Sequence, residues 1–428
     1  MKPLTDLNRR FHVIGSIALI LFLFSISVQA QEIITLRVVS SDSELTEAEI
    51  ANFEEANPDI RIELIDWNGF SYDTAVALGE IPDILRVQAT DMPQLVRDGI
   101  LLDLTPYFEA SDLIQIDDLA NATDYYLFDG RYYGLPKDWS LDFSLYIYVP
   151  AFEAAGIPIP DTDEPLTYAE LASLAQQLTI KDGNTVTQYG FYTYFLERAI
   201  SSILTQRGLS LFNEDYTEMN LINNPEALEV VRYFYDMVVN DTMYADTDGM
   251  WGLITGGKVA IFQYGYWFGG AISEEDAVYN HLIMLPAPTW SHELPRMNTT
   301  IGPTGIAIPS LSEHPDEAYR FFEWYTVGEA GIDRTIGGWG APVLLSMFDL
   351  LPHDTESARQ RLDVLRSELP YSDWILPIYP YQSITTTFIQ SWLQNIQLAR
   401  TGEIDFDTFA SNIQEAVNLA ILDEQLGL

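Results

Sequence analysis

Aromatic residues are the class in this sequence most able to build a binding site. Among its nine Trp and 24 Tyr, eight residues fall at expected strand ends or in glycine-rich turns: Trp67, Trp139, Trp251, Tyr264, Tyr266, Trp267, Trp290 and Trp339. An indole beside an acid or amide suits a sugar, because the sugar's C–H face stacks on the ring while its hydroxyls need charged or amide partners. The alternative for each ring is core packing, which we expect for Trp324 and Trp392 on helical stripes.

Polar residues next to these aromatics are further candidates. Asn68 follows Trp67, Thr304 lies in a glycine-rich segment, and Lys137 and Asp138 precede Trp139. Lys137 stands out because only three lysines follow residue 30. It forms either an internal salt bridge with Asp138 or Asp142, or a cleft charge that selects a hydroxyl-rich or acidic sugar.

Catalytic and metal motifs are weak here. Gly252 to Lys258 spells G-x-x-x-x-G-K, but Val259 stands where a phosphate-binding loop needs Ser or Thr, so a helix-to-strand turn is the better interpretation. The histidines lie apart, and carboxylates are too abundant for any pair to indicate a glycosidase. We therefore expect no enzyme, no metal and no cofactor.

Composition narrows the possible partners. Asp and Glu outnumber Lys and Arg by 63 to 21, for a formal charge of −42, which disfavours nucleic acid and anionic lipid. The absence of cysteine excludes disulfides, zinc–thiolate sites and a lipid-bearing N-terminal cysteine.

Residues 1–30 are typical of a signal peptide. Lys2, Arg9 and Arg10 precede an apolar run from about Val13 to Val28, and Val28-Gln29-Ala30 offers a cleavage site. The run is shorter than the roughly 20 residues of a membrane-spanning helix. Cleavage is favoured over retention as an anchor.

The remaining chain has the length of two domains and an alternating pattern of strands and helices. Strands are expected near 33–39, 60–64 and 82–87, with a helix at about 45–56. Capping signals begin helices at Thr167, Asn224 and His314, and the last helical stretch breaks at Thr401-Gly402. The pattern predicts an α/β fold with mainly parallel sheets.

In order along the chain, six segments resemble signatures of the family 1 extracellular solute-binding proteins, relatives of maltose-binding protein. These segments are Phe53–Ile60, Ile81–Ile84, Gly99–Tyr107, Gly130–Pro136, Gly257–Trp267 and Gly302–Pro309. The chain departs from the pattern at Val149, where relatives usually place Asn, and in lacking the lipid-bearing Cys.

The resemblance implies a two-lobed binding-protein fold of type II, each lobe a sheet flanked by helices, that closes around a ligand. Lobe one would span 32–138 plus 303–338, and lobe two 139–302 plus 339–428. Matched positions imply ligand contacts for Gln88, Asp138, Trp267, Trp339 and Gly340. The residues' own chemistry adds Trp67, Asn68, Lys137, Trp139, Tyr266 and Thr304 to these candidates.

The expected function is capture of a mono- or oligosaccharide outside the cytoplasm and its delivery to the permease of an ABC importer. We expect a periplasmic or extracellular monomer that meets the membrane only through the permease. Two alternatives stay open. The same fold could bind a polyamine, sulfonate, sugar phosphate or peptide, or the protein could be a secreted glycosidase.

Overall fold

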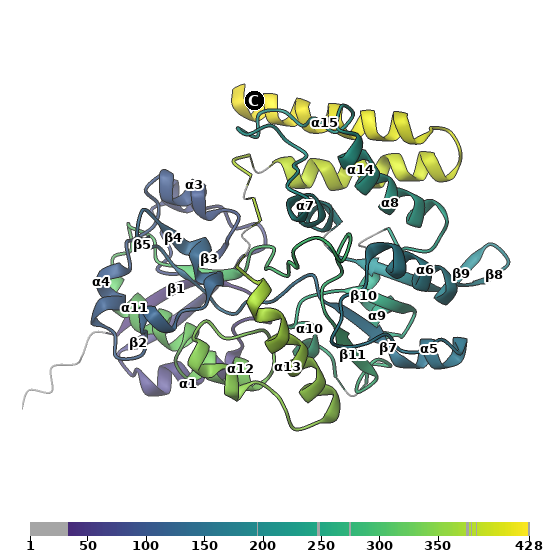
Figure 1. Ribbon diagram of the computed structural model, residues 1–428. Coiled ribbons are helices and arrows are strands. Elements are labelled where there is room, and N and C mark those ends of the chain that lie inside the picture. The colour runs from purple at the N-terminus through teal and green to yellow at the C-terminus, as the bar shows by residue number, and fades with distance from the viewer. Residues whose placement is uncertain are drawn as a thin grey trace, which may run out of the picture.

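The computed structural model describes residues 33–194, 196–245, 249–273, 275–373, 376–377, 379–381 and 383–426 (Figure 1). The segment 1–30, interpreted as a signal peptide, lies outside these residues. Within the described part of the chain, no helix is long and apolar enough to cross a membrane.

The first lobe is built on strands in the order β2-β1-β3-β12-β6. β1 and β2 pair in parallel, a bridge from Val38 to Ile84 joins β1 to the segment before β3, and β12 lies between β3 and β6. Its elements are β1 (Ile34–Ser40), α1 (Glu47–Ala56), β2 (Ile60–Asp66), α2 (Tyr72–Leu78), β3 (Leu85–Gln88), α3 (Met92–Arg97), α4 (Thr105–Ala110), η1 (Ile116–Asp118), η2 (Asn121–Tyr126), β4 (Leu127–Phe128), β5 (Arg131–Tyr132), β6 (Leu135–Pro136), β12 (Thr304–Ala307), α11 (Pro315–Thr326) and α12 (Glu329–Ile336).

The helix that follows β1 shows how the sequence sets these elements. Thr46 and Glu49 form a reciprocal capping box at the start of α1, and the Asn57 side chain closes its last turn. α1 buries Phe53 completely, against the rings of Phe321 and Trp324 on α11. The helix expected from His314 is therefore confirmed as part of the first-lobe core.

The second lobe has a five-stranded sheet in the order β11-β7-β10-β9-β8. Its elements are β7 (Leu145–Tyr148), α5 (Val149–Ala155), α6 (Tyr168–Leu178), β8 (Ile180–Asp182), β9 (Thr185–Thr193), α7 (Leu196–Gln206), α8 (Pro225–Val239), α9 (Met250–Thr255), β10 (Val259–Gln263), α10 (Phe268–Ala271), β11 (Leu282–Leu285), η3 (Leu345–Leu350), α13 (Glu356–Glu368), η4 (Leu369–Tyr371), α14 (Ser383–Arg400) and α15 (Phe406–Leu426). The capping signals at Thr167 and Asn224 are confirmed at α6 and α8. The G-x-x-x-x-G-K segment forms the end of α9 and the turn into β10, as expected.

Helices α14 and α15 form an antiparallel pair at the top of Figure 1, above α7 and α8. The chain turns between them at Gly402, whose φ of +76° favours glycine. Trp392 is 1% exposed and meets the ring of Phe409 edge-on at 4.9 Å. The prediction that Trp392 is a core residue is confirmed.

The prediction of mainly parallel sheets is wrong, because both sheets are mixed. β12 runs antiparallel to β3 and β6, and β7 runs antiparallel to β10 and β11. The reason is the direction in which the chain enters each strand. β3, β6, β9 and β10 run toward the space between the lobes, whereas β7 and β12 begin there, directly after the chain has crossed from one lobe to the other.

Three crossing segments lie side by side beneath that space and are hydrogen-bonded together. The Lys137 amide donates to the Thr304 carbonyl at 3.0 Å, and the Asp142 amide donates to the Thr299 carbonyl at 3.0 Å. On the other side, Trp139 and Ala341 exchange backbone hydrogen bonds of 3.0 and 2.7 Å. Residues 137–142 thus form the central strand of a ribbon flanked by 299–304 and 339–341, which we name the crossover ribbon.

The third crossing contributes to the cores of both lobes. Val343, Leu344 and Met347 pack with the first-lobe core, whereas Phe348 and Leu351 pack in a cluster with Trp139. The residue limits given above for the two lobes stay a prediction.

Asn298 anchors the crossover ribbon to the second lobe. Its fully buried amide accepts from the Phe143 amide at 3.2 Å and donates to the Ser144 hydroxyl at 2.8 Å and to the Glu368 carboxylate at 2.9 Å. Glu368 also accepts from the Ala287 amide and pairs with Arg296. The Asn298 side chain therefore links two crossing segments to the end of α13.

We expect Asn298→Ala to lower the free energy of unfolding by about 2–4 kcal/mol, because the buried Phe143 amide loses its acceptor and the Ser144 hydroxyl and the Glu368 carboxylate each lose a buried donor. Denaturant unfolding measures the loss. Asn223→Ala, at an exposed position before α8, is the control and should change stability by less than about 0.5 kcal/mol. Equal losses in both variants would contradict the anchoring role of Asn298.

Candidate ligand-binding cleft

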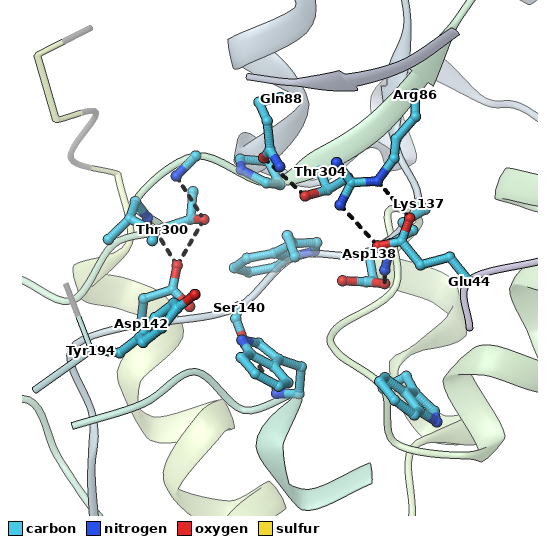
Figure 2. Close-up of a pocket in the computed structure, with 16 residues that line it drawn as sticks. Glu44, Arg86, Gln88, Lys137, Asp138, Ser140, Asp142, Tyr194, Thr300 and Thr304 are labelled. Carbon is cyan, nitrogen blue, oxygen red and sulfur yellow. Dashed lines mark hydrogen bonds and ion pairs between the residues drawn. The ribbon is translucent and has the colours of Figure 1, made fainter. Parts of the chain in front are cut away.

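A cavity of about 350 Å³ lies between the lobes, above the crossover ribbon (Figure 2). Its position follows from the topology, since β3, β6, β9 and β10 all end at this edge, where α/β folds commonly bind ligands. The lining residues are Glu44, Arg86, Gln88, Lys137, Asp138, Trp139, Ser140, Asp142, Tyr194, Trp267, Thr300, Ile301, Gly302, Pro303, Thr304 and Trp339.

The first lobe contributes a polar wall. Gln88 ends β3 and Thr304 begins β12, so the two are register partners, and the Thr304 hydroxyl donates to Gln88 Oε1 at 3.0 Å. Beside them, Arg86 donates from Nε and Nη2 to the two oxygens of Glu44 at 2.7 and 3.0 Å. Burial acts to raise the pKa of Glu44, but the hydrogen bond from Arg86 and the nearby positive charges outweigh it and hold the pKa below its ordinary value.

The crossover ribbon contributes a second ion pair. Lys137 Nζ lies 2.6 Å from Asp138 Oδ2, and Arg334 Nε lies 4.0 Å from the same oxygen. Burial acts to lower the pKa of Lys137, but the charges of Asp138, Tyr325 and Glu44 together outweigh it and raise the pKa. Of the two partners considered for Lys137, the structure selects Asp138, and the pair itself lines the cavity.

Asp142 is a different kind of acid, since it is buried and accepts hydrogen bonds from neutral groups. Its Oδ2 accepts from the Ile301 amide at 2.9 Å and from the Thr300 hydroxyl at 3.1 Å. Burial raises the pKa of Asp142 to about 7, the two hydrogen bonds act in the opposite direction, and the Asp138 charge adds to the rise. Near neutral pH the cleft therefore holds a carboxyl group that is only partly ionised.

Aromatic rings supply the apolar part of the cleft. Trp139 is 4% exposed, and its indole Nε1 donates to the Pro342 carbonyl at 2.7 Å. Trp339 is 42% exposed, Tyr194 is 37% exposed and Trp267 is half-buried. These rings offer both a fixed floor and surfaces open to a ligand.

The hollow continues past Trp339. A second cavity of about 470 Å³ shares Glu44, Lys137 and Trp339 with the first and adds residues of α1 and α12, including Glu49 and Arg334. Among the described residues, no group of three or more His, Cys, Asp or Glu is placed to bind a metal ion.

Comparison with known proteins identifies the family of this chain. The family model described as bacterial extracellular solute-binding protein matches residues 40–331. The chain belongs to that family. The resemblance drawn from the sequence motifs is thereby confirmed.

Solved structures of solute-binding proteins share the fold. An ABC substrate-binding protein from Listeria monocytogenes, in complex with cycloalternan, is 20% identical, with a TM-score of 0.73 over 93% of this chain and 100% of that chain. The GacH receptor of Streptomyces glaucescens, solved unliganded and with acarbose, is 18% identical, with a TM-score of 0.70 over 91% and 99%. The sugar-binding protein MalE from Xanthomonas citri is 15% identical, with a TM-score of 0.68 over 92% and 98%. No curated protein matches the chain significantly.

Within this solute-binding protein, seven of the candidate residues line the first cavity: Gln88, Lys137, Asp138, Trp139, Trp267, Thr304 and Trp339. The sequence placed them at the ends of strands or in crossing segments, and the structure brings those positions together. Their contact with a ligand stays a proposal.

The other four candidates lie outside the cavity lining. Trp67 stacks on Arg86, with the guanidinium carbon 4.5 Å from the ring centroid, and Asn68 donates to Asp66. Tyr266 is 3% exposed and packs in the second-lobe core. Gly340 has a φ of +135°, and a Cβ there would lie 2.9 Å from Cβ of Asp138, so its small size lets Asp138 pack against the third crossing.

Several lining residues were not among the predicted ligand contacts, although their positions carried a signal. Arg86 lies two residues before Gln88 on β3, so strand alternation puts both side chains on one face. The same period connects Ser140 and Asp142 to Asp138 along the crossover ribbon. Glu44 follows the end of β1 as Tyr194 follows the end of β9, where side chains meet the cleft.

The raised pKa of Asp142 predicts a pH effect on stability. Between its ordinary value and about 7, the folded chain holds a proton that the unfolded chain lacks, so acid favours folding and the gain is lost as pH rises through 7. In this window the contribution of Asp142 changes by up to about 1.4 kcal/mol per pH unit.

We expect the wild type to lose stability relative to Asp142→Asn as pH increases from about 5 to 8, because only the wild type carries the titrating acid. Denaturant unfolding at a series of pH values measures it. Asp182→Asn, at an exposed position on β8, should follow the wild type. Parallel pH profiles for wild type and Asp142→Asn would contradict the assignment.

Proposed function

We propose that this solute-binding protein captures a carbohydrate in the cleft outside the cytoplasm and delivers it to the permease of an ABC importer. The observation that carries the proposal is the pairing of open aromatic faces with fixed polar groups. Trp267 and Trp339 present ring surfaces to the cavity, while Gln88, Asp138 and Thr304 present hydrogen-bonding atoms to it. Stacking on a ring and hydrogen bonding at the rim is the combination that a sugar requires.

The size of the hollow supports a ligand of one or more sugar rings. The first cavity lies at the lower end of the 300–1,000 Å³ typical of small-molecule sites, and the second cavity extends it beyond Trp339. The related structures named above include proteins in complex with cycloalternan and with acarbose, which are sugar ligands of those proteins. Capture without turnover is part of the proposal, as is action by a monomer.

One observation favours a second candidate, a cationic solute such as a polyamine. Asp142 lines the cavity together with Tyr194 and Trp267, and no Lys or Arg forms an ion pair with it among the described residues. A carboxylate beside aromatic rings attracts ammonium groups. We rank it second because burial favours the neutral form of this acid, which a cation does not recognise.

A thermal-shift screen of mono- and oligosaccharides, with putrescine and spermidine in the same plate, separates the two candidates. A ligand present at 100 times its dissociation constant adds about 2.7 kcal/mol of stability. We expect at least one sugar to do so. Stabilisation by the polyamines alone would move the assignment to the second candidate, and hydrolysis of a glycoside panel would refute a pure capture role.

Trp267→Ala tests the site directly. We expect it to weaken binding of the sugar found in the screen by about tenfold or more, because a stacking surface worth about 0.5–1.5 kcal/mol and its buried area are lost. Titration calorimetry measures the change. Trp251→Ala, a 39% exposed tryptophan that lines neither cavity, is the matched control. Unchanged affinity in Trp267→Ala would place the sugar elsewhere.

A further inference from the structure

The cationic side chains of the cleft lie beside carboxylates of this chain. Arg86 makes two hydrogen bonds to Glu44, and Lys137 lies 2.6 Å from Asp138, which Arg334 approaches at 4.0 Å. These are the Lys and Arg residues that line either cavity. Each of them therefore has a carboxylate of this chain within 4.0 Å.

These pairs are largely removed from solvent. The Arg86 and Glu44 side chains are 11% and 21% exposed, and those of Lys137 and Asp138 are 12% and 15% exposed. In such surroundings a charge interacts more strongly with its neighbours than it would in water. A ligand entering the cleft therefore meets Arg86 and Lys137 already held by carboxylates of this chain.

This arrangement treats charged and neutral sugars differently. A carboxylate or phosphate on the ligand would lose its hydration, find Arg86 and Lys137 already bound to carboxylates, and lie beside the acids Glu44, Asp138 and Asp142. A hydroxyl can donate to the carboxylates and accept from the nitrogens without breaking either pair. Nη1 of Arg86 offers such a donor, since it makes no hydrogen bond to the described residues.

Building on the proposed carbohydrate site, we propose that the cleft selects neutral sugars and that Glu44 excludes acidic ones by neutralising Arg86. Glu44 follows the end of β1 and reaches Arg86 on β3 across 42 positions of sequence. It is thus a specificity-determining residue, separate from the rings that bind the sugar face.

Trp67 makes this assignment testable. Its ring stacks on the Arg86 guanidinium, with the guanidinium carbon 4.5 Å from the ring centroid. Arg86 therefore keeps one contact that holds it in place when the Glu44 carboxylate is removed. Lys137 keeps its partner Asp138 as well. Glu44→Gln therefore changes one thing in the cleft, leaving a single guanidinium without a carboxylate.

The experiment measures dissociation constants by titration calorimetry at pH 7 for neutral sugars and their uronic acids, taken in pairs. The probes are glucose with glucuronate, galactose with galacturonate, mannose with mannuronate, and the disaccharide counterparts of the sugar that binds best. We expect the wild type to prefer the neutral member by at least tenfold. Glu44→Gln should lower this preference by at least tenfold, and adding Arg86→Gln to it should restore the preference.

Glu55→Gln is the matched control, since it removes the same charge at an exposed position on α1 of the same lobe. It should leave the preference unchanged. Thermal unfolding checks the fold of each variant. If Glu44→Gln does not fold, Asp138→Asn removes the carboxylate beside Lys137 and Arg334 and should shift the preference in the same direction.

Each remaining outcome overturns one part of the proposal. A wild type that binds a uronate as tightly as its neutral partner refutes selection for neutral sugars, although sugar capture then stands. An unchanged preference in both Glu44→Gln and Asp138→Asn refutes the role of the ion pairs. Binding of neither sugar class refutes the proposed function, and the selectivity falls with it.

Discussion

The crossover ribbon is the constraint on which the rest of this structure depends. Three separate passages of chain between the lobes are hydrogen-bonded side by side, with residues 137–142 in the middle. Because these passages carry Lys137, Asp138, Trp139, Asp142, Thr304 and Trp339, the ribbon is both the joint between the lobes and a large part of the cleft wall. Any rotation of one lobe against the other must move residues that line the cavity, so a change in the angle between the lobes also changes the shape of the cleft.

The buried charged groups of the cleft contribute less to the stability of the fold than apolar residues would. Ion pairs taken out of water are at best weakly stabilising, since the loss of hydration offsets much of their attraction, and a hydrophobic replacement often serves a core better. Here two such pairs and the buried acid Asp142 are concentrated around one cavity. The cores on either side are built from apolar residues such as Phe53, Phe152 and Trp392. This separation of apolar cores from a polar joint is what a binding site between two rigid bodies requires.

The sequence was most informative where local rules decide the structure. Helix caps such as Thr167 with Glu170 and turns such as Gly402 depend on neighbouring residues, and their elements formed where expected. The mixed direction of the sheets could not be predicted in this way, because it depends on which strands follow a crossing. The family motifs supplied the two-lobed fold, which the strand and helix pattern alone left open.

Within the candidate site, the limit of prediction is the direction of each side chain. Tyr266 and Trp267 are neighbours in one glycine-rich turn, yet one is buried in the core and the other lines the cavity. Both are aromatic residues in the same turn, so the sequence makes them equal candidates for ligand contact. Only the path of the backbone decides which of them faces the cavity. Trp67 shows the same limit at longer range, since it reaches the site through Arg86, and the Glu44–Arg86 pair joins positions that nothing local connects.

The place of β12 in the first-lobe sheet has a consequence for how the protein is made. This strand lies between β3 and β6, yet it is synthesised after most of the second lobe. Until residue 307 has emerged, the two strands that should flank it face each other across a gap with their backbone groups unpaired, and such open edges invite wrong pairing. The first lobe therefore cannot complete its fold early, and a chain of this topology benefits from being kept unfolded until its synthesis is nearly finished.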